Sequence, residues 1–260
     1  MNMKLATFNA NSIRARLALI IEWLDREQPD ILCIQESKVQ DKDFPEHQFE
    51  AAGYHVIFRG QKSYNGVAII SKFPLDDVRL NLYEDGDEEA RFISAIIRTI
   101  PVINVYVPQG FAPGTEKFAY KLRWLKDLLS YIIKNYDPGL PLVLTGDFNV
   151  ALEPIDVYDP EGFRGEVGFH PDEQAIMREY FAWGFVDIFR KHQPDGGHYT
   201  FWDYRIPHAL KRKMGWRIDY ILSTPPLAEG SRSVSIDTDV RLHEKPSDHT
   251  FLVAEFKNED

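Results

Sequence analysis

Short apolar runs recur from one end of the chain to the other, separated by polar stretches. They are rich in Ile, Val and Phe and too short for amphipathic helices, so they predict buried β-strands. The predicted strands cover residues 5–8, 31–34, 67–70, 92–97, 102–107, 140–144, 218–222 and 251–256.

Three longer segments repeat apolar residues every three or four positions, which predicts helices with one apolar face. Ser12 is placed to cap the first of these helices, which must end near Pro29. Thr115 is placed to cap the second, and the third runs from about Pro171 to Trp183. Many strands with few helices predict an α/β fold in which two sheets pack together with helices outside.

The composition agrees with a single folded domain covering residues 1–260. Apolar residues make up 44% of the chain and charged residues 27%, which excludes a disordered or collagen-like protein. Cys33 is the only cysteine, so an intrachain disulfide and a zinc–thiolate site are both excluded. No apolar run approaches the ~20 residues that cross a membrane, and the first residues lack the apolar stretch of a signal peptide. We therefore expect a cytoplasmic protein with no membrane partner.

The charge is unevenly distributed along the chain. The formal net charge is −10, which is not typical of a protein that coats nucleic acid without specificity. Residues 203–217 contain five basic residues and one acidic residue, so this segment carries +4 and the rest of the chain −14. Such a run is often only a solvated loop, but it is also compatible with a local nucleic-acid contact.

Residues able to do chemistry lie at the ends of the predicted strands, where a rigid scaffold presents its functional loops. If these strand ends converge, four carboxylates, several amides, a tyrosine and a histidine meet in one pocket. The residues concerned are Asn9, Asn11, Glu36, Tyr106, Gln109, Asp147, Asn149, Asp219, Asp248 and His249.

The residue types suggest separate tasks within such a pocket. Glu36 and Asp248 are candidates for a Mg²⁺ site, because Mg²⁺ prefers carboxylate oxygens, although each alone could be a loop or capping carboxylate. Asp147 and Asn149, two residues apart on an extended segment, would point to the same side and hold one water molecule. His249 is a candidate phosphate ligand.

Eight stretches in this order resemble the exonuclease III family of abasic-site endonucleases, within the wider endonuclease/exonuclease/phosphatase fold. Each stretch is a weak signal alone, but their order over about 240 residues is specific. They are TFNANSIR (7–14), PDILCIQESK (29–38), NGVA (65–68), VYVPQG (105–110), LTGDFN (144–149), WGFVDIFR (183–190), GWRID (215–219) and EKPSDH (244–249).

The resemblance implies a four-layer α/β sandwich, with two packed mixed β-sheets flanked by helices. It also implies a Mg²⁺-dependent phosphodiesterase of base excision repair, with Mn²⁺ as a substitute ion. Such an enzyme cuts double-stranded DNA 5′ to an abasic site and leaves a 3′-hydroxyl. It also degrades DNA from 3′ ends and cleans blocked 3′ ends. We expect it to act as a monomer.

The resemblance also implies roles for individual residues. Asn9, Glu36 and Asp248 would hold or border the metal with Asn11 close by, although many relatives carry Asp at position 11. Asp147 would activate or position the attacking water and Asn149 would orient it, or both would hold a second metal. Tyr106 and His249 would contact the scissile phosphate, with Asp219 orienting His249. Phe201, Trp202 and Trp216 would line a pocket for the abasic sugar. The full set of implied DNA contacts is Arg14, Lys38, Gln109, Phe201, Trp202, Arg205, Lys211, Arg212, Lys213, Trp216 and Arg217.

Other functions share this fold. An RNA deadenylase or an inositol polyphosphate phosphatase would use the same catalytic set, since each also cuts a phosphoester. The aromatic pair at 201–202 and the stretches 183–190 and 244–249 favour DNA repair. A non-catalytic DNA-binding protein would be expected to have lost part of the catalytic set, and this chain retains it.

Overall fold

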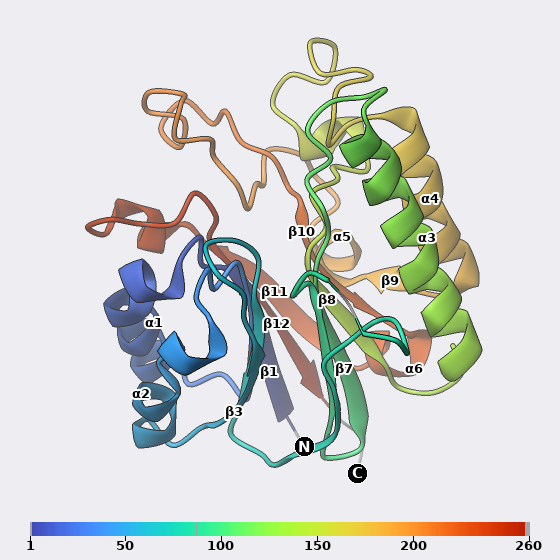
Figure 1. Cartoon of the computed structure of the whole chain (residues 1–260). Coiled ribbons are helices and arrows are strands. Elements are labelled where there is room, and N and C mark those ends of the chain that lie inside the picture. The colour runs from blue at the N-terminus through green and yellow to red at the C-terminus, as the bar shows by residue number, and fades with distance from the viewer. Residues whose placement is uncertain (1, 87, 258–260) are drawn as a thin grey trace.

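Two six-stranded sheets pack face to face in the computed structural model, which describes residues 2–86 and 88–257 (Figure 1). The first sheet has the order β11-β12-β1-β2-β4-β3 and the second β5-β6-β7-β8-β10-β9. The strands of the first sheet are β1 (Asn2–Asn9), β2 (Ile31–Gln35), β3 (His55–Arg59), β4 (Val67–Ser71), β11 (Ser231–Asp237) and β12 (Phe251–Lys257). Those of the second are β5 (Leu75–Arg79), β6 (Phe92–Ile97), β7 (Ile100–Tyr106), β8 (Val143–Asp147), β9 (Val186–Asp187) and β10 (Asp219–Ser223).

Helices cover the outer face of each sheet. In Figure 1, α1 and α2 lie on the left against the first sheet, and α3 and α4 lie on the right against the second. The predicted four-layer sandwich is therefore confirmed. The helices are α1 (Ile13–Glu27), α2 (Glu46–Ala51), α3 (Glu116–Asn135), α4 (Pro171–Trp183), α5 (Ile188–His192) and α6 (Pro225–Ala228), with 3₁₀ turns at Asp41–Asp43, Pro154–Asp156 and Thr238–Leu242. None of the helices described has the length and apolar composition that a bilayer crossing requires.

The inner strands are apolar on both faces because both faces are covered. In β2, Ile31 and Cys33 point toward the second sheet, whereas Leu32 and Ile34 point toward α1. A strand buried on both sides reads as a continuous apolar run rather than an alternating one. The eight predicted strands correspond to such strands, and the structure adds β3, β5, β9 and β11.

The helix starts agree with the sequence in one case and differ in another. The hydroxyl of Thr115 accepts a hydrogen bond from Phe118 N at 3.2 Å, so it caps α3 as predicted. Ser12 precedes α1, but its side chain makes no capping bond, so that prediction is wrong. The backbone N–H groups of Ser12 and Ile13 are bound instead by the carbonyls of Glu36 and Ser37, at 2.8 and 3.0 Å. The start of α1 is therefore tied to the loop after β2.

A buried polar contact joins the two sheets near the ends of β2 and β7. Gln35 Nε2 donates to Asn104 Oδ1 at 2.7 Å and to Thr7 Oγ1 at 2.9 Å. Asn104 Nδ2 donates in turn to the carbonyls of Ile34 and Ala68, each at 2.9 Å. Apolar contacts are non-directional whereas hydrogen bonds are directional. This contact therefore fixes the alignment of the two sheets at the end where their functional residues lie.

Candidate active site

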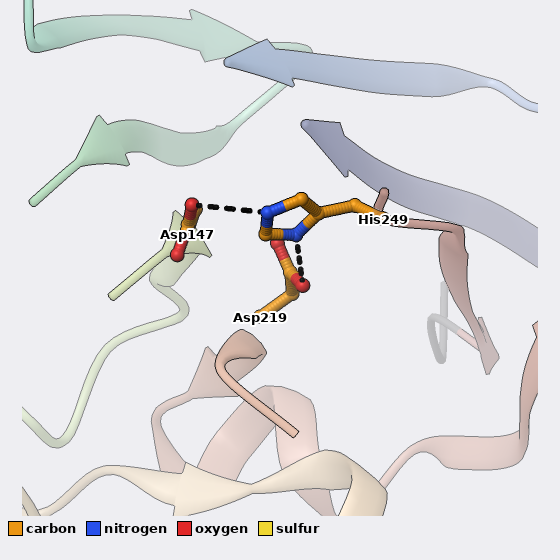
Figure 2. Close-up of side chains that lie close together, drawn as sticks. All are labelled: Asp147, Asp219 and His249. Atoms are coloured by element: carbon orange, nitrogen blue, oxygen red, sulfur yellow. Dashed lines mark hydrogen bonds and ion pairs between the residues drawn. The ribbon is translucent and has the colours of Figure 1, made fainter. Parts of the chain in front are cut away.

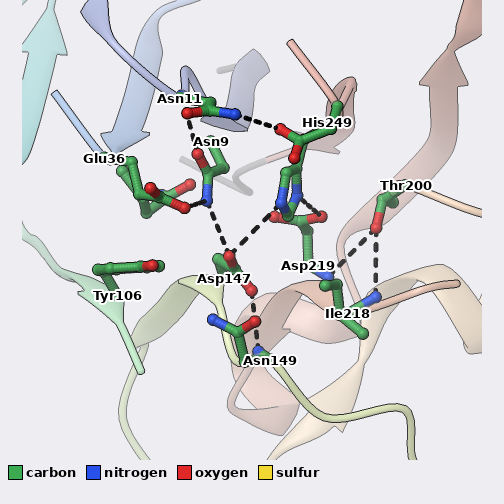
Figure 3. A network of polar contacts seen from close by, with 12 residues as sticks. Asn9, Asn11, Glu36, Tyr106, Asp147, Asn149, Thr200, Ile218, Asp219 and His249 are labelled. Atoms are coloured by element: carbon green, nitrogen blue, oxygen red, sulfur yellow. Dashed lines mark hydrogen bonds and ion pairs between the residues drawn. The ribbon is translucent and has the colours of Figure 1, made fainter. Parts of the chain in front are cut away.

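Strand ends from both sheets converge at the upper end of the sandwich in Figure 1, and Figure 3 shows the side chains that meet there. The first sheet contributes Asn9 at the end of β1, Glu36 after β2 and the segment before β12 that contains His249. In the second sheet, Tyr106 pairs with Asp147 across β7 and β8, and Asp147 pairs with Asp219 across β8 and β10. The convergence expected from the sequence is therefore present.

His249 lies between two carboxylates, as Figure 2 shows. Its Nδ1 is 2.8 Å from Asp219 Oδ2, its Nε2 is 3.7 Å from Asp147 Oδ2, and all three residues are buried. Burial alone lowers the pKa of His249, but Asp219 and Asp147 outweigh that effect and raise the pKa to about 10. Burial also raises the pKa of Asp147, against the opposing charge of His249. At neutral pH His249 is thus an imidazolium, which is a hydrogen-bond donor and not a base.

Asn9 connects the two sheets through its amide group. Its Nδ2 donates to Glu36 Oε1 and to Asp147 Oδ2, each at 2.8 Å. Its Oδ1 accepts from Asn11 N at 2.9 Å. The amide nitrogen therefore faces the two carboxylates, so Asn9 separates and orients them without presenting an oxygen to an ion between them.

Glu36 belongs to a second polar cluster at the rim. Lys38 Nζ is 2.7 Å from Glu36 Oε2 and 2.6 Å from Asn11 Oδ1, and Asn11 Nδ2 donates to Asp248 Oδ1 at 2.9 Å. Burial raises the pKa of Glu36, but Lys38, the Asn9 amide and the charge of His249 together lower it below its usual value, so the carboxylate is ionised at neutral pH. Lys38, which was expected to contact DNA, lies within this cluster.

Asn149 follows β8 in a turn. Its φ is 53°, its backbone N–H donates to Asp147 Oδ1 at 2.8 Å, and its Nδ2 donates to Val107 O at 3.0 Å. The expectation of an extended segment with Asp147 and Asn149 on one side is wrong, because the strand ends at Asp147. The turn nevertheless keeps the two residues in contact.

Tyr106 lies beside the carboxylates with its ring against a cation. The guanidinium of Arg91 is 4.9 Å from the ring centroid, and Arg91 is itself held by Glu89 at 2.7 Å. Burial raises the pKa of Tyr106 well above its usual value, and the charges of Glu36 and Asp147 raise it further. The phenol therefore stays protonated and can donate a hydrogen bond.

Sequence reasoning missed three residues that shape the site. Arg91 supports Tyr106, and its only signal is a basic residue directly before the apolar run 92–97. Thr200 Oγ1 accepts from the backbone of Ile218 and Asp219, both at 3.2 Å, and nothing in the sequence signals this contact. Ser247, inside the quoted stretch 244–249, donates to Asn9 O at 2.8 Å and accepts from His249 N at 3.2 Å.

The donor chemistry of the site fits a hard cation. Among the described residues, ligand atoms of Asp147, Asp219 and His249 lie within 4.8 Å of one another. In that triad, however, the imidazolium of His249 already lies between the two carboxylates and offsets one of their two negative charges. The rim cluster of Glu36, Asp248 and Asn11 offers oxygen atoms, which Mg²⁺ and similar ions prefer. The rim therefore offers oxygen ligands alone, of which those of Glu36 and Asn11 are shared with the ammonium of Lys38.

Most of the expected DNA contacts lie on the surface around this site. Phe201 and Trp216 are half-buried and pack with Phe163, and the Phe201 ring centroid is 4.9 Å from that of His249. In Figure 1 the orange segment that carries the basic run projects beyond the strand ends. The exposed residues are Arg14, Gln109, Arg205, Lys211, Arg212 and Lys213.

Two expected DNA contacts require correction. Arg217 is 0% exposed, and its guanidinium is bound by Asp156 at 2.7 Å and by Asp187 at 2.9 Å, so it cannot reach a phosphate. Trp202 is 3% exposed and packs with Tyr199 and Ala209 in a small core of its own. Trp202 therefore supports the projecting segment from inside and does not line a sugar pocket.

The chain matches the Endonuclease/Exonuclease/phosphatase family over residues 6–249. It belongs to that family. It is also 36% identical to exodeoxyribonuclease III of Haemophilus influenzae, with 98% of this chain and 100% of the relative covered. The chain is thus a nuclease that hydrolyses ester bonds, and the family to which it belongs is metal-dependent.

Solved structures of family members resemble the fold closely. An AP endonuclease from Archaeoglobus fulgidus superposes with a TM-score of 0.95 at 48% identity, covering 98% of this chain and 100% of that one. A 3′ phosphatase from Neisseria, bound to a product DNA hairpin, superposes with a TM-score of 0.94 at 36% identity and the same coverage. The sandwich described above is thus the fold of DNA-processing members of the endonuclease/exonuclease/phosphatase family.

Proposed function

We propose that this chain is a Mg²⁺-dependent DNA-repair nuclease that cuts 5′ to abasic sites and leaves a 3′-hydroxyl. The same site would remove nucleotides and blocking groups from 3′ ends. The observation that carries the proposal is the buried cluster of Asp147, Asp219 and His249 beside the ionised Glu36. A phosphodiester cut needs an oriented water, donors for the developing negative charge and relief for the leaving oxygen, and this cluster supplies groups for each.

The cluster supports a division of tasks at the scissile phosphate. Glu36 and Asp248 would hold Mg²⁺, with Asn9 and Asn11 beside it, and the ion would supply positive charge to the phosphate and the leaving oxygen. Asp147 would orient the attacking water and take its proton, and Asn149 would orient the same water.

Two donors would bind the non-bridging phosphate oxygens as their negative charge grows. These are the imidazolium of His249, which Asp219 orients, and the neutral phenol of Tyr106. Both donors are buried, so they would bind the phosphate without rearrangement of solvent. Their protonation at neutral pH is what this task requires.

The surface around the cluster supports DNA as the substrate. Lys211, Arg212 and Lys213 project beyond the site on a segment with its own small core, so their charges are held near a bound backbone. Phe201 lies next to His249 and pairs with Trp216, and these two rings would receive the sugar of an extruded nucleotide. An abasic nucleotide has no base to unstack, so its extrusion costs less than that of an intact one. One chain would act on one lesion as a monomer.

A labelled duplex with one stable abasic analogue tests this proposal directly. We expect a nick immediately 5′ of the lesion with Mg²⁺ or Mn²⁺, none with EDTA, and none with the Asp147→Asn variant under either condition. Shortening from the 3′ end with the lesion ignored would leave an exonuclease as the main activity. An intact duplex in every condition would contradict the proposal, and poly(A) RNA and inositol polyphosphates would be the next substrates.

A further inference from the structure

A fully buried ion pair lies behind the site, outside the groups assigned above. Lys121 comes from α3 and Glu173 from the first turn of α4, and both residues are 0% exposed. The two side chains are in direct contact. Burying a charged pair costs desolvation energy, which their attraction repays only with good geometry and further hydrogen bonds.

The additional hydrogen bonds of Lys121 go to the loops that border the site. Its Nζ donates to the carbonyl of Asn149 at 2.7 Å and to that of Gln109 at 3.2 Å. Asn149 is the residue whose backbone N–H binds Asp147 Oδ1. One buried ammonium thus holds the loop after β7 and the loop after β8 at the point where the second enters the site.

Glu173 connects the same ammonium to a third loop. Its Oε2 accepts from Gly168 N at 2.8 Å and from His170 N at 3.1 Å, and Gly168 O accepts from Ala151 N at 2.7 Å. A Cβ added to Gly168 would be 3.3 Å from the ring of Trp216, so this loop also borders the aromatic residues. The pair is therefore the common anchor of loops 107–111, 148–151 and 166–170.

Attachment of α3 to α4 does not require this pair. The two helices already pack through Leu125, Leu129, Ile176 and Met177 in one apolar cluster. An apolar pair at these positions would extend that cluster without a desolvation cost, but it could not bind backbone carbonyls or N–H groups. The charged pair therefore holds the loops by hydrogen bonds that an apolar pair could not form.

We propose that Lys121 and Glu173 are positioning residues of the nuclease reaction, which hold Asn149 and Gln109 in place for the substrate. This inference rests on the proposed function of the site. Lys121 acts on the substrate only through these residues and is not itself catalytic. A displacement of about 1 Å in a site of this kind costs about 100-fold in rate.

Replacing both charges separates positioning from stability. Removing one partner leaves a buried unpaired charge and destabilises the fold, whereas an apolar pair is often as stable as the original. We expect the Lys121→Met, Glu173→Leu double variant to have a higher urea midpoint than either single variant, because it leaves no unpaired charge, but a lower one than the unmodified protein, because Asn149 O and Gly168 N lose their partners. We expect its kcat to stay about 100-fold lower, and hydrogen exchange in 107–111 and 148–151 to be faster.

Tyr180→Phe is the matched control. The Tyr180 hydroxyl donates to Leu125 O at 2.6 Å, so it bridges the same two helices inside the fold without touching the loops. We expect this variant to lose some stability while its kcat and the exchange of both loops stay unchanged. A double variant that regains stability, kcat and loop protection together would overturn the proposal.

Two further measurements keep the outcome decisive. If the double variant does not fold, Glu173→Gln is the second variant, because it keeps an oxygen for Gly168 N and His170 N, although it leaves Lys121 without a charged partner and so lowers stability as well. Unchanged exchange in 148–151 would then overturn the proposal. Hydrogen exchange does not depend on cleavage, so a failure of the proposed function, seen as no cleavage by the unmodified protein, is distinguishable from a failure of this inference.

Discussion

Asp219 Oδ2 lies 2.8 Å from Nδ1 of His249, and both side chains are buried. Burial disfavours the imidazolium, so its presence at neutral pH depends on the charge of Asp219 together with that of Asp147. His249 is therefore protonated at neutral pH because these two carboxylates lie beside it.

The Asp219→Asn substitution should lower the pKa of His249. The loss of one neighbouring carboxylate corresponds to about 1–3 pKa units, so most of the imidazolium remains at neutral pH, and turnover there should fall mainly because Asp219 no longer orients the ring. Because the imidazolium is the active form, the alkaline limb of the pH–rate profile should move to lower pH. An NMR titration of the His249 ring in the metal-free protein measures the shift directly, and an unchanged pKa would contradict the assignment.

The Asp147→Asn substitution should separate catalysis from binding. Asn keeps the size of the side chain and an oxygen for the N–H of Asn149, but it cannot take a proton from water. We expect turnover to fall by about 10²–10⁴-fold while the Kd for an abasic duplex in EDTA changes little. Single-turnover cleavage and fluorescence anisotropy measure the two quantities, and near-normal turnover would remove Asp147 from the proton-accepting role.

Charge reversal of Lys211, Arg212 and Lys213 to Glu should weaken DNA binding and reduce its salt dependence. For every phosphate that the protein no longer neutralises, the slope of log K against log[salt] should become shallower by about 0.9. The matched control reverses Lys134, Arg232 and Lys257, which are exposed at the opposite end of the sheets. An equal slope in both triple variants would show that the projecting segment does not bind the DNA backbone.

Asp156→Asn should destabilise the fold in a pH-dependent way. Burial raises the pKa of Asp156, but Arg217 and Arg190 lower it below the usual value of 3.8. A depressed carboxyl pKa gives stability that is present above the usual pKa and is lost as pH falls through the lowered one. We expect the variant to lose about 3–5 kcal/mol at pH 7, and the difference from the unmodified protein to shrink below about pH 4.

Urea unfolding at a series of pH values measures this difference. Asp203→Asn is the control, because Asp203 pairs with Arg205, whose side chain is 89% exposed. Exposed pairs of that kind contribute little to stability. A pH-independent loss in Asp156→Asn would mean that packing, and not the charge of Asp156, stabilises this region.

The sequence predicted the inner strands and missed the edges for a physical reason. The strands β3, β5, β9 and β11 are the four outermost strands of the two sheets. An edge strand is buried only in part, so β5 has no fully buried residue and β11 has one, and neither carries a continuous apolar run. The inner strands are covered on both faces, which explains why their sequences are continuous apolar runs.

The site was predictable as a set of strand ends but not as a set of contacts. The order of the motifs indicated which residues would converge. It could not indicate that Arg217 pairs with Asp156, 61 positions away, or that Gln35 meets Asn104, 69 positions away. Such partners depend on how helices and sheets pack, and that packing also decides that Trp202 faces inward while Trp216 remains half-exposed.

The pairing of β1 with β12 has a consequence for biosynthesis. These two strands lie side by side in the middle of the first sheet, with Asn2 opposite Lys257 and Thr7 opposite Leu252. During translation Asn9 and Glu36 leave the ribosome early, but the centre of their sheet stays open until residues near 257 have emerged. Asp248 and His249 join them at the same late moment. A chain released prematurely would therefore lack both the pairing of β1 with β12 and His249, and its proposed active site would be incomplete.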